Sequence, residues 1–152
     1  RLQPCLRRVH DGTGVHRQMT SMDKSRVVIP KGMEAFYDRL HFAPAIRDGN
    51  RLYCSGVIGV GADGKAPEDP EAQFTLAFEL LQSVLTTAGI SFADVIEVTT
   101  FHVGLQAHLR TFVKVKDRYL REPYPSWTAI GITELAVPGA LVEIKVIARL
   151  AS

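Results

Sequence analysis

Hydrophobic residues recur along this chain first at strand spacing, then at helix spacing, and then at both again. Two short strands are predicted over residues 42–46 and 51–58, joined by the turn Asp48-Gly49-Asn50, where glycine accepts the positive φ of a hairpin. A helix is predicted to begin at the capping residue Asp69 and to end at Gly89. One stripe of this helix is apolar, so we expect it to pack in the core.

A second helix is predicted over residues 107–120. Its large apolar side chains, Phe112, Val115 and Tyr119, share one stripe and are expected to be buried. Its charged side chains are expected to face water; they are Lys114, Lys116, Asp117 and Arg118, with Arg121 just beyond.

Three further segments alternate as strands do, over residues 95–103, 127–135 and 141–150. The predicted order is β-β-α-β-α-β-β, an α+β fold in which both one-sided helices cover one face of a single mixed sheet. The opposite face then carries Val, Ile and Thr beside an occasional charge such as Glu143. Because a half-apolar open face usually finds a partner, we expect self-association.

Charge is distributed unevenly along the 152 residues. Residues 1–30 carry six basic and two acidic side chains, and the remaining residues carry 12 basic and 14 acidic ones. The predicted domain therefore has no basic excess for a phosphate backbone, and we expect no nucleic-acid partner. No apolar run approaches the roughly 20 residues of a membrane span, so we also expect no membrane association. The two cysteines form no disulfide framework, and we interpret the protein as cytoplasmic.

We interpret residues 1–30 as a leader, disordered or vector-derived, and residues 31–152 as one domain. The leader has no clear period and ends near Met19 and Met22, either of which would suit a native start. An arginine-rich, acid-poor transit peptide is the alternative interpretation. In either case we expect residues before about Ser25 to be dispensable for folding.

Chemical motifs of the familiar enzyme classes are absent. The sequence has no phosphate-binding loop with its lysine, no cysteine or histidine pair at metal spacing, and no nucleophile elbow around a serine. We therefore expect no metal and no cofactor. The residues alone leave the roles of three side chains open. His102 is interpreted as a satisfied or interface histidine rather than a catalytic one, and Glu143 as an interface partner or a water-activating carboxylate. Trp127 is interpreted as a core or interface anchor or as a pocket wall.

Three stretches together resemble the Rid (YjgF-type) family. Residues 49–56, Gly-Asn-Arg-Leu-Tyr-Cys-Ser-Gly, match its G-N-x-[LI]-x-x-S-G hairpin. Residues 94–103 match D-I-V-K-T-T-V-F-V. Residues 125–128, Pro-Ser-Trp-Thr, and 142–148, Val-Glu-Ile-Lys-Val-Ile-Ala, match P-A-R-S and I-E-I-E-A-I-A. The sequence is most similar to the YjgH-like branch.

The resemblance implies a chorismate-mutase-like fold, assembled as a homotrimer with a cleft at each subunit interface. In the deaminating members, the arginine of P-A-R-S binds the carboxylate of a 2-imino acid by two parallel hydrogen bonds. Water held near the I-E-I glutamate then attacks the C=N carbon, and ammonia leaves.

Carried over residue by residue, the resemblance keeps part of this site and changes the rest. Glu143 stands at the glutamate and is the candidate catalytic residue. Trp127 replaces the arginine. The candidate substrate-binding residues are Phe42, Ser55, Gly56, Val113, Trp127, Thr128 and Ala129. Phe42, Val113 and Ala129 replace a tyrosine, an asparagine and a cysteine, so the changes point to a more apolar pocket without a carboxylate clamp.

The function we predict is that of a trimeric Rid-like protein that binds a small uncharged imine, enamine or carbonyl metabolite, with hydrolysis of this ligand left open by the sequence. The main alternative is a non-catalytic ligand-binding or interaction protein on the same scaffold. A 2-imino acid deaminase, with Arg149 or Lys145 turned into the cleft as the clamp, is a further alternative. An endoribonuclease, as the family is sometimes named, has neither charge nor a histidine pair to support it.

Overall fold

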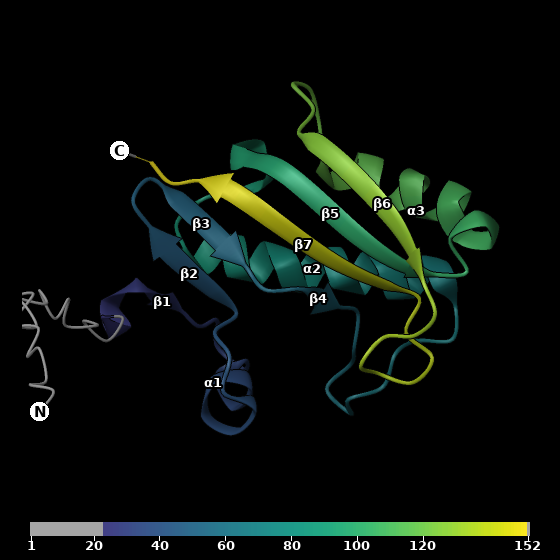
Figure 1. Ribbon diagram of the computed structural model, residues 1–152, viewed down its shortest axis with the longest axis horizontal. Helices are drawn as coiled ribbons and strands as arrows, with labels where there is room; N and C mark the ends of the chain where they lie inside the picture. The colour runs from purple at the N-terminus through teal and green to yellow at the C-terminus, as the bar shows by residue number, and fades with distance from the viewer. Residues whose placement is uncertain (1–22, 152) are drawn as a thin grey trace, which may run out of the picture.

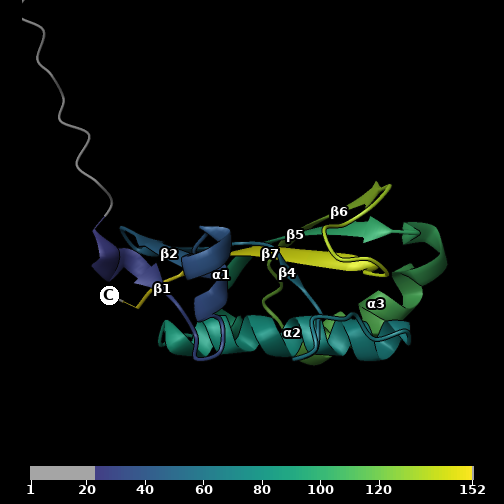
Figure 2. The same ribbon diagram turned by 90° about the horizontal axis from the view of Figure 1, so that it is seen from below.

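A mixed seven-stranded sheet forms the centre of the protein, and two long helices cover one of its faces (Figures 1 and 2). The computed structural model describes residues 23–151. The strands lie in the order β1-β2-β3-β7-β5-β6, and β4 pairs with β7 at the end that β3 leaves free. The edge pair β5 and β6 is parallel, and the other pairs are antiparallel.

The elements follow the predicted order with three additions. The strands are β1 (Val27–Val28), β2 (Ala45–Asp48), β3 (Arg51–Cys54), β4 (Val57–Ile58), β5 (Val95–Val103), β6 (Ser126–Ile132) and β7 (Val142–Arg149). The helices are α1 (Glu34–Leu40), α2 (Pro70–Thr87) and α3 (Leu105–Tyr119), with short 3-10 turns at Lys24–Arg26 and Phe92–Asp94. The α+β class and the single mixed sheet under α2 and α3 are confirmed.

The additions are short elements that hydrophobic periodicity does not reveal. Helix α1 has seven residues, none of them buried, and β1 has two. The strand predicted over residues 51–58 is interrupted at Ser55-Gly56, so that β3 and β4 pair with opposite ends of β7. A pattern of alternation cannot show this interruption, because the residues on both sides of it are apolar.

The folded region begins before residue 31, where the sequence placed the start of the domain. Strand β1 pairs with β2, and the side chain of Val28 is only 3% exposed. Arg26 donates to the backbone carbonyl of Arg47 and forms an ion pair with Asp48. The segment 23–30 therefore belongs to the sheet, and the first 22 residues of the predicted leader lie outside the described residues.

The core lies between the sheet and the two helices. Alternate residues of β5 and β7 point into it, and the aromatic rings of Phe74, Phe78 and Phe112 pack together above them. Asp69 caps α2 as predicted, since its carboxylate accepts the backbone N–H of Ala72 at 2.8 Å.

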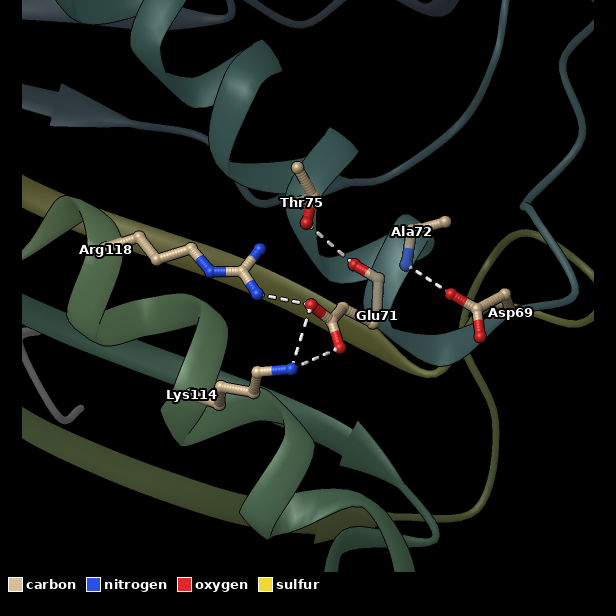
Figure 3. A network of polar contacts seen from close by, with 6 residues as sticks. All are labelled: Asp69, Glu71, Ala72, Thr75, Lys114 and Arg118. Carbon is tan, nitrogen blue, oxygen red and sulfur yellow. Dashed lines mark hydrogen bonds and ion pairs between the residues drawn. The ribbon is translucent and has the colours of Figure 1, made fainter.

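A polar network fastens the start of α2 to α3 (Figure 3). The carboxylate of Glu71 accepts hydrogen bonds from Lys114, at 3.0 Å, and from Arg118. The side chains of Lys114 and Arg118 therefore point toward α2, where both are paired with the Glu71 carboxylate. This matters for the site, because it removes two of the cations of α3 from the sheet edge at β6.

Candidate functional site

The sequence-predicted site residues separate into two groups on opposite faces of the sheet. We call the group around Glu143, with Phe42, Ser55 and Gly56, the glycine half-site. We call the group around Trp127, with Val113 and Ala129, the tryptophan half-site. Each group is held in place by different means.

In the glycine half-site the backbone of Gly56 lies directly against the side chain of Glu143. A Cβ atom at Gly56 would overlap the Glu143 carboxylate, so only glycine leaves room for it. Glu143 pairs with Ile58 of β4 and with Phe101 of β5. Its neighbours in β7, Val142 and Ile144, are buried under the helices, so Glu143 points to the open face.

The Glu143 carboxylate has no hydrogen bond or ion pair within residues 23–151. Its side chain is half-buried. A half-buried carboxylate without a partner in its own chain can accept hydrogen bonds from water, a ligand or another copy of the chain.

Ser55 and Phe42 complete this half-site. The Ser55 hydroxyl donates to the carbonyl oxygen of Ala43 at 2.7 Å, and the Ser55 backbone N–H donates to that of Pro44 at 2.9 Å. These bonds hold residues 42–44 against the β3–β4 break. Phe42 stacks on Phe36 of α1 with 5.4 Å between ring centroids and stays exposed. The structure thus places Gly56 against Glu143 and ties the neighbouring Ser55 to the segment that follows Phe42.

In the tryptophan half-site, Trp127 lies on the helix-covered side of the edge strand β6. It pairs in register with Val98, which is buried, and its ring packs on Phe112 of α3 with 5.9 Å between centroids. The indole Nε1–H donates to Thr100 Oγ1 at 2.9 Å. The ring is therefore fixed at one edge, while 37% of the residue remains exposed.

His102 extends this hydrogen-bond chain into the core. Its Nε2 lies 2.8 Å from Thr100 Oγ1, and its Nδ1 has no partner among residues 23–151. Burial, and to a smaller degree the charge of His108, lowers the pKa of His102 from 6.5 to about 4. His102 is therefore a neutral histidine at physiological pH, with one ring nitrogen hydrogen-bonded and the other without a partner in the described part of the chain.

Lys116 is the residue that sequence reasoning placed wrongly. We expected its side chain to face water, but it is only 12% exposed, and its Nζ lies 5.1 Å from the centroid of the Trp127 ring. Its ammonium also pairs with Asp117 at 2.6 Å. The signal that sequence offered was spacing, since Lys116 follows the candidate residue Val113 by three positions and so shares its helix face.

A cavity of about 320 Å³ lies beside the Trp127 ring. It is lined by Val113, Lys116, Asp117, Leu120, Tyr124, Pro125 and Trp127. A second cavity, of about 270 Å³ at the C-terminal ends of α2 and α3, contains none of the predicted site residues. The first cavity is thus the one in which a ligand would meet the tryptophan half-site.

The remaining two candidates divide between the faces. Ala129 pairs with Thr100 and so lies on the same side of the sheet as Trp127. Thr128 pairs with Thr99, exposed on the open face, and does not line the cavity beside Trp127. Because successive residues of a strand point to opposite faces, Trp127 and Thr128 cannot both contact one ligand in that cavity.

The same alternation separates Trp127 from Glu143. Trp127 belongs to the row that contains Val98 and Val146, and Glu143 belongs to the row that contains Phe101 and Ile130. The sheet lies between the two side chains, so one chain by itself does not form a pocket that contains both.

Other functional classes find no support among residues 23–151. That part of the chain holds no group of three or more histidine, cysteine, aspartate or glutamate side chains able to bind a metal ion. No described helix has the length and apolar character needed to cross a membrane. Burial raises the pKa of the Cys54 thiol to about 12, which leaves it unreactive as a nucleophile.

Comparison with known proteins agrees with this fold and these motifs. The sequence model of the family described as Endoribonuclease L-PSP matches residues 33–150. The chain belongs to this family, the Rid family. The match includes every candidate site residue.

Several Rid relatives cover most of the chain. The RutC family protein YjgH of Escherichia coli (strain K12) is 39% identical over 130 residues, which cover 85% of this chain and 98% of that protein. A solved structure of protein YJGH superposes with a TM-score of 0.76, covering 83% of this chain and 96% of that one. A 2-iminobutanoate/2-iminopropanoate deaminase of Dermatophagoides farinae is 28% identical over 111 residues, 68% of this chain and 81% of that protein. The predicted YjgH-like membership is confirmed.

Proposed function

We propose that this Rid protein is a cytoplasmic homotrimer in which a cleft between copies binds a small imine, enamine or carbonyl metabolite and hydrolyses it. The observation that carries the proposal is the placement of the two half-sites on opposite faces of one sheet. A cleft that contains both requires the glycine half-site of one copy and the tryptophan half-site of another. The exposed apolar side chains of the open face, Tyr53 and Ile130 among them, supply surface for such an interface.

In this cleft Glu143 is the general base. Its carboxylate accepts a proton from a water molecule as the water oxygen attacks the carbon of the C=N bond. The proton is then returned to nitrogen to give a carbinolamine. When the carboxylate next carries the proton of the new hydroxyl group to nitrogen, the C–N bond breaks to give a carbonyl product and ammonia. Gly56 gives the carboxylate the space that this position needs, and its backbone lies where it can contact the substrate.

The tryptophan half-site determines what the cleft accepts. Trp127, Val113 and Ala129 stand where deaminating members are expected to have arginine, asparagine and cysteine. A 2-imino acid would lose two parallel hydrogen bonds from a planar guanidinium, and a lysine cannot replace these in kind. We therefore expect this protein to deaminate 2-imino acids, the substrates that the name of the Dermatophagoides farinae relative gives, only at a low level.

The alternative is a binding protein without turnover on the same scaffold. The observation that favours it is that three of the four changes from the family pattern, at Val113, Trp127 and Ala129, lie in one half-site, as expected if ligand contact was altered while the scaffold was kept. An endoribonuclease function, which the family description carries, remains without support from charge, because the residues after residue 30 carry more acidic than basic side chains.

Oligomeric state is the first test. Sedimentation velocity or light scattering at micromolar concentration should give about three times the 16.8 kDa mass of the chain. A stable monomer would contradict both the trimer and the location of the cleft between copies.

Activity on 2-imino acids generated in situ is the second test. The unmodified protein should be nearly inactive, Trp127→Arg should raise kcat/KM at least about tenfold, and Glu143→Gln in that background should abolish the gain. Gln106→Arg is the matched control, because it adds the same charge to an exposed position of α3. Strong deamination by the unmodified protein, independent of Trp127, would contradict our account, and turnover of no C=N substrate by either protein would favour the binding alternative.

A further inference from the structure

The wall of the cavity beside Trp127 includes a cationic side chain, Lys116, that neither the motifs nor the family resemblance indicate. The Lys116 side chain is 12% exposed, whereas that of its partner Asp117 is 56% exposed. In this ion pair the Lys116 side chain is therefore packed against the protein, and the Asp117 side chain faces water. The ammonium lies over the indole face, 5.1 Å from the ring centroid, at the wall of the 320 Å³ cavity.

The hydrogen-bonding capacity of this ammonium is not used up. A lysine ammonium has three N–H donors and no acceptor. Within residues 23–151, Asp117 Oδ1 is the one acceptor that Lys116 reaches, and the indole ring takes a second direction. A donor is left for a group in the cavity, and a carboxylate or similar anion is the acceptor that gains most from a partly desolvated cation.

Neighbouring charges leave Lys116 as the cation of this cavity. Lys114 and Arg118, two residues away on either side, are both bound to Glu71 on α2 (Figure 3). Asp117, the partner of Lys116, also lines the cavity, and the rest of the lining is apolar or aromatic, from Val113, Leu120, Tyr124, Pro125 and Trp127. The cavity thus combines flat apolar walls with one ion pair, whose ammonium is the donor that faces a ligand.

We propose that this cavity binds a small organic anion with a flat apolar body, whose anionic head is held by the Lys116 ammonium. The body lies against Trp127 and Tyr124, and the head takes the free donor of Lys116 or displaces Asp117 from it. The proposal rests on the proposed function only in that the cavity is one half of the cleft. It changes the expected ligand from an uncharged metabolite to an anionic one.

The fluorescence of Trp127, the single tryptophan of the chain, allows a direct test with the full-length protein. Benzoate and benzamide serve as probes, because they share a flat ring and size and differ in charge. With excitation selective for tryptophan, benzoate should change the emission in a saturable way, and benzamide should bind about tenfold more weakly. Calorimetric titration supplies the same two affinities independently of the fluorophore.

Variants separate the role of Lys116 from general charge effects. Lys116→Met should weaken benzoate binding about tenfold and leave benzamide unchanged, so that the two probes bind alike. Lys114→Met removes the same charge from the same helix and should leave both affinities unchanged. If Lys116→Met loses folded structure by circular dichroism, Lys116→Gln takes its place in the comparison.

The proposal is overturned if benzoate and benzamide bind the unmodified protein equally, if neither binds, or if both lysine variants weaken benzoate to the same extent. These outcomes do not depend on turnover or on Glu143. Selective benzoate binding without any hydrolysis would contradict the proposed function alone, and Glu143-dependent hydrolysis without selective benzoate binding would contradict the anion site alone.

Discussion

The two half-sites of this protein are built by different means. The glycine half-site depends on the backbone: Gly56 has no side chain and Glu143 occupies the space. The tryptophan half-site depends on side chains, with Trp127 hydrogen-bonded to Thr100 and packed between Phe112 and Lys116. A site made by side chains can change its ligand by substitution while the fold is kept, whereas a site made by close backbone approach tolerates few residues. This difference explains why all of the departures from the family pattern except Phe42 lie around Trp127.

The largest effect expected concerns two glycines that differ only in what surrounds them. A Cβ atom at Gly59 would overlap the backbone carbonyl oxygen of Gln73 in α2, so Gly59→Ala should lower the free energy of unfolding by about 3 kcal/mol. A Cβ atom at Gly56 would meet the movable end of the Glu143 side chain, so Gly56→Ala should cost less than about 1 kcal/mol.

Urea unfolding of both variants measures this contrast, and hydrolysis of the C=N substrate measures the consequence for the site. Gly56→Ala should impair hydrolysis because it displaces Glu143. Equal destabilisation by the two substitutions would show that Glu143 is packed rigidly and that the glycine half-site is a structural feature only.

The next effect concerns pH and the buried end of the tryptophan half-site. The folded pKa of His102 is about 4 and the unfolded value is about 6.5, so the unfolded chain binds the proton more tightly. Stability from His102 should be fully present above pH 6.5 and should fall by about 3 kcal/mol as pH drops toward 4.

Chemical unfolding from pH 7 to pH 4 measures this dependence. Other groups titrate in the same range, and the Arg118 and Lys114 contacts lower the pKa of Glu71, so the control is His102→Gln, which cannot take up the proton. The variant should show a flatter decline than the unmodified protein. Parallel declines would mean that His102 is accessible to water.

A smaller effect is expected from the acceptor that holds the indole. Thr100→Val keeps the shape of the side chain and leaves the Trp127 N–H without its partner, which should cost about 1 kcal/mol. The emission maximum of Trp127 should also move to longer wavelength, as the freed ring turns toward water. Thr99→Val, at the neighbouring position on the open face, is the matched control and should leave the emission unchanged. Identical spectra for all three proteins would show that packing on Phe112 alone positions the ring.

The smallest effect concerns the chain before the glycine half-site. Removal of residues 1–22 should leave the melting temperature unchanged within about a degree, because their sequence offers little that could join a core. Removal of residues 1–30 also deletes β1 and the buried Val28, and should lower the melting temperature by roughly 5 °C. A large drop from the shorter truncation would show that the leader packs on the domain.

Much of the fold could be predicted because long elements repeat their pattern many times. Helix α2 and strands β5 and β7 bury one side over eight residues or more, so their type and faces are readable from periodicity. Helix α1 and strands β1 and β4 could not be predicted in this way, since two to seven residues contain too few repeats.

Sequence motifs could name candidate site residues, but they could not predict how these residues are arranged. Motif matches named Glu143, Gly56 and Trp127, and alternation correctly assigned Glu143 to the open face. Lys116 was misassigned because a charged residue on an amphipathic helix is normally exposed, and only the neighbouring strand β6 brings an indole ring under its ammonium.

By itself, then, the sequence determined the α+β class, the order of the long elements, the family, and the residue types available for chemistry. These follow from local periodicity and from motifs that are read along the chain. Tertiary structure alone decided which side chains share a face. The parallel pairing of β6 with β5 turns Trp127 toward α3 and Lys116, while the antiparallel pairing of β7 turns Glu143 to the opposite side. That outcome depends on the register between strands distant in sequence, where a shift of one residue reverses every face.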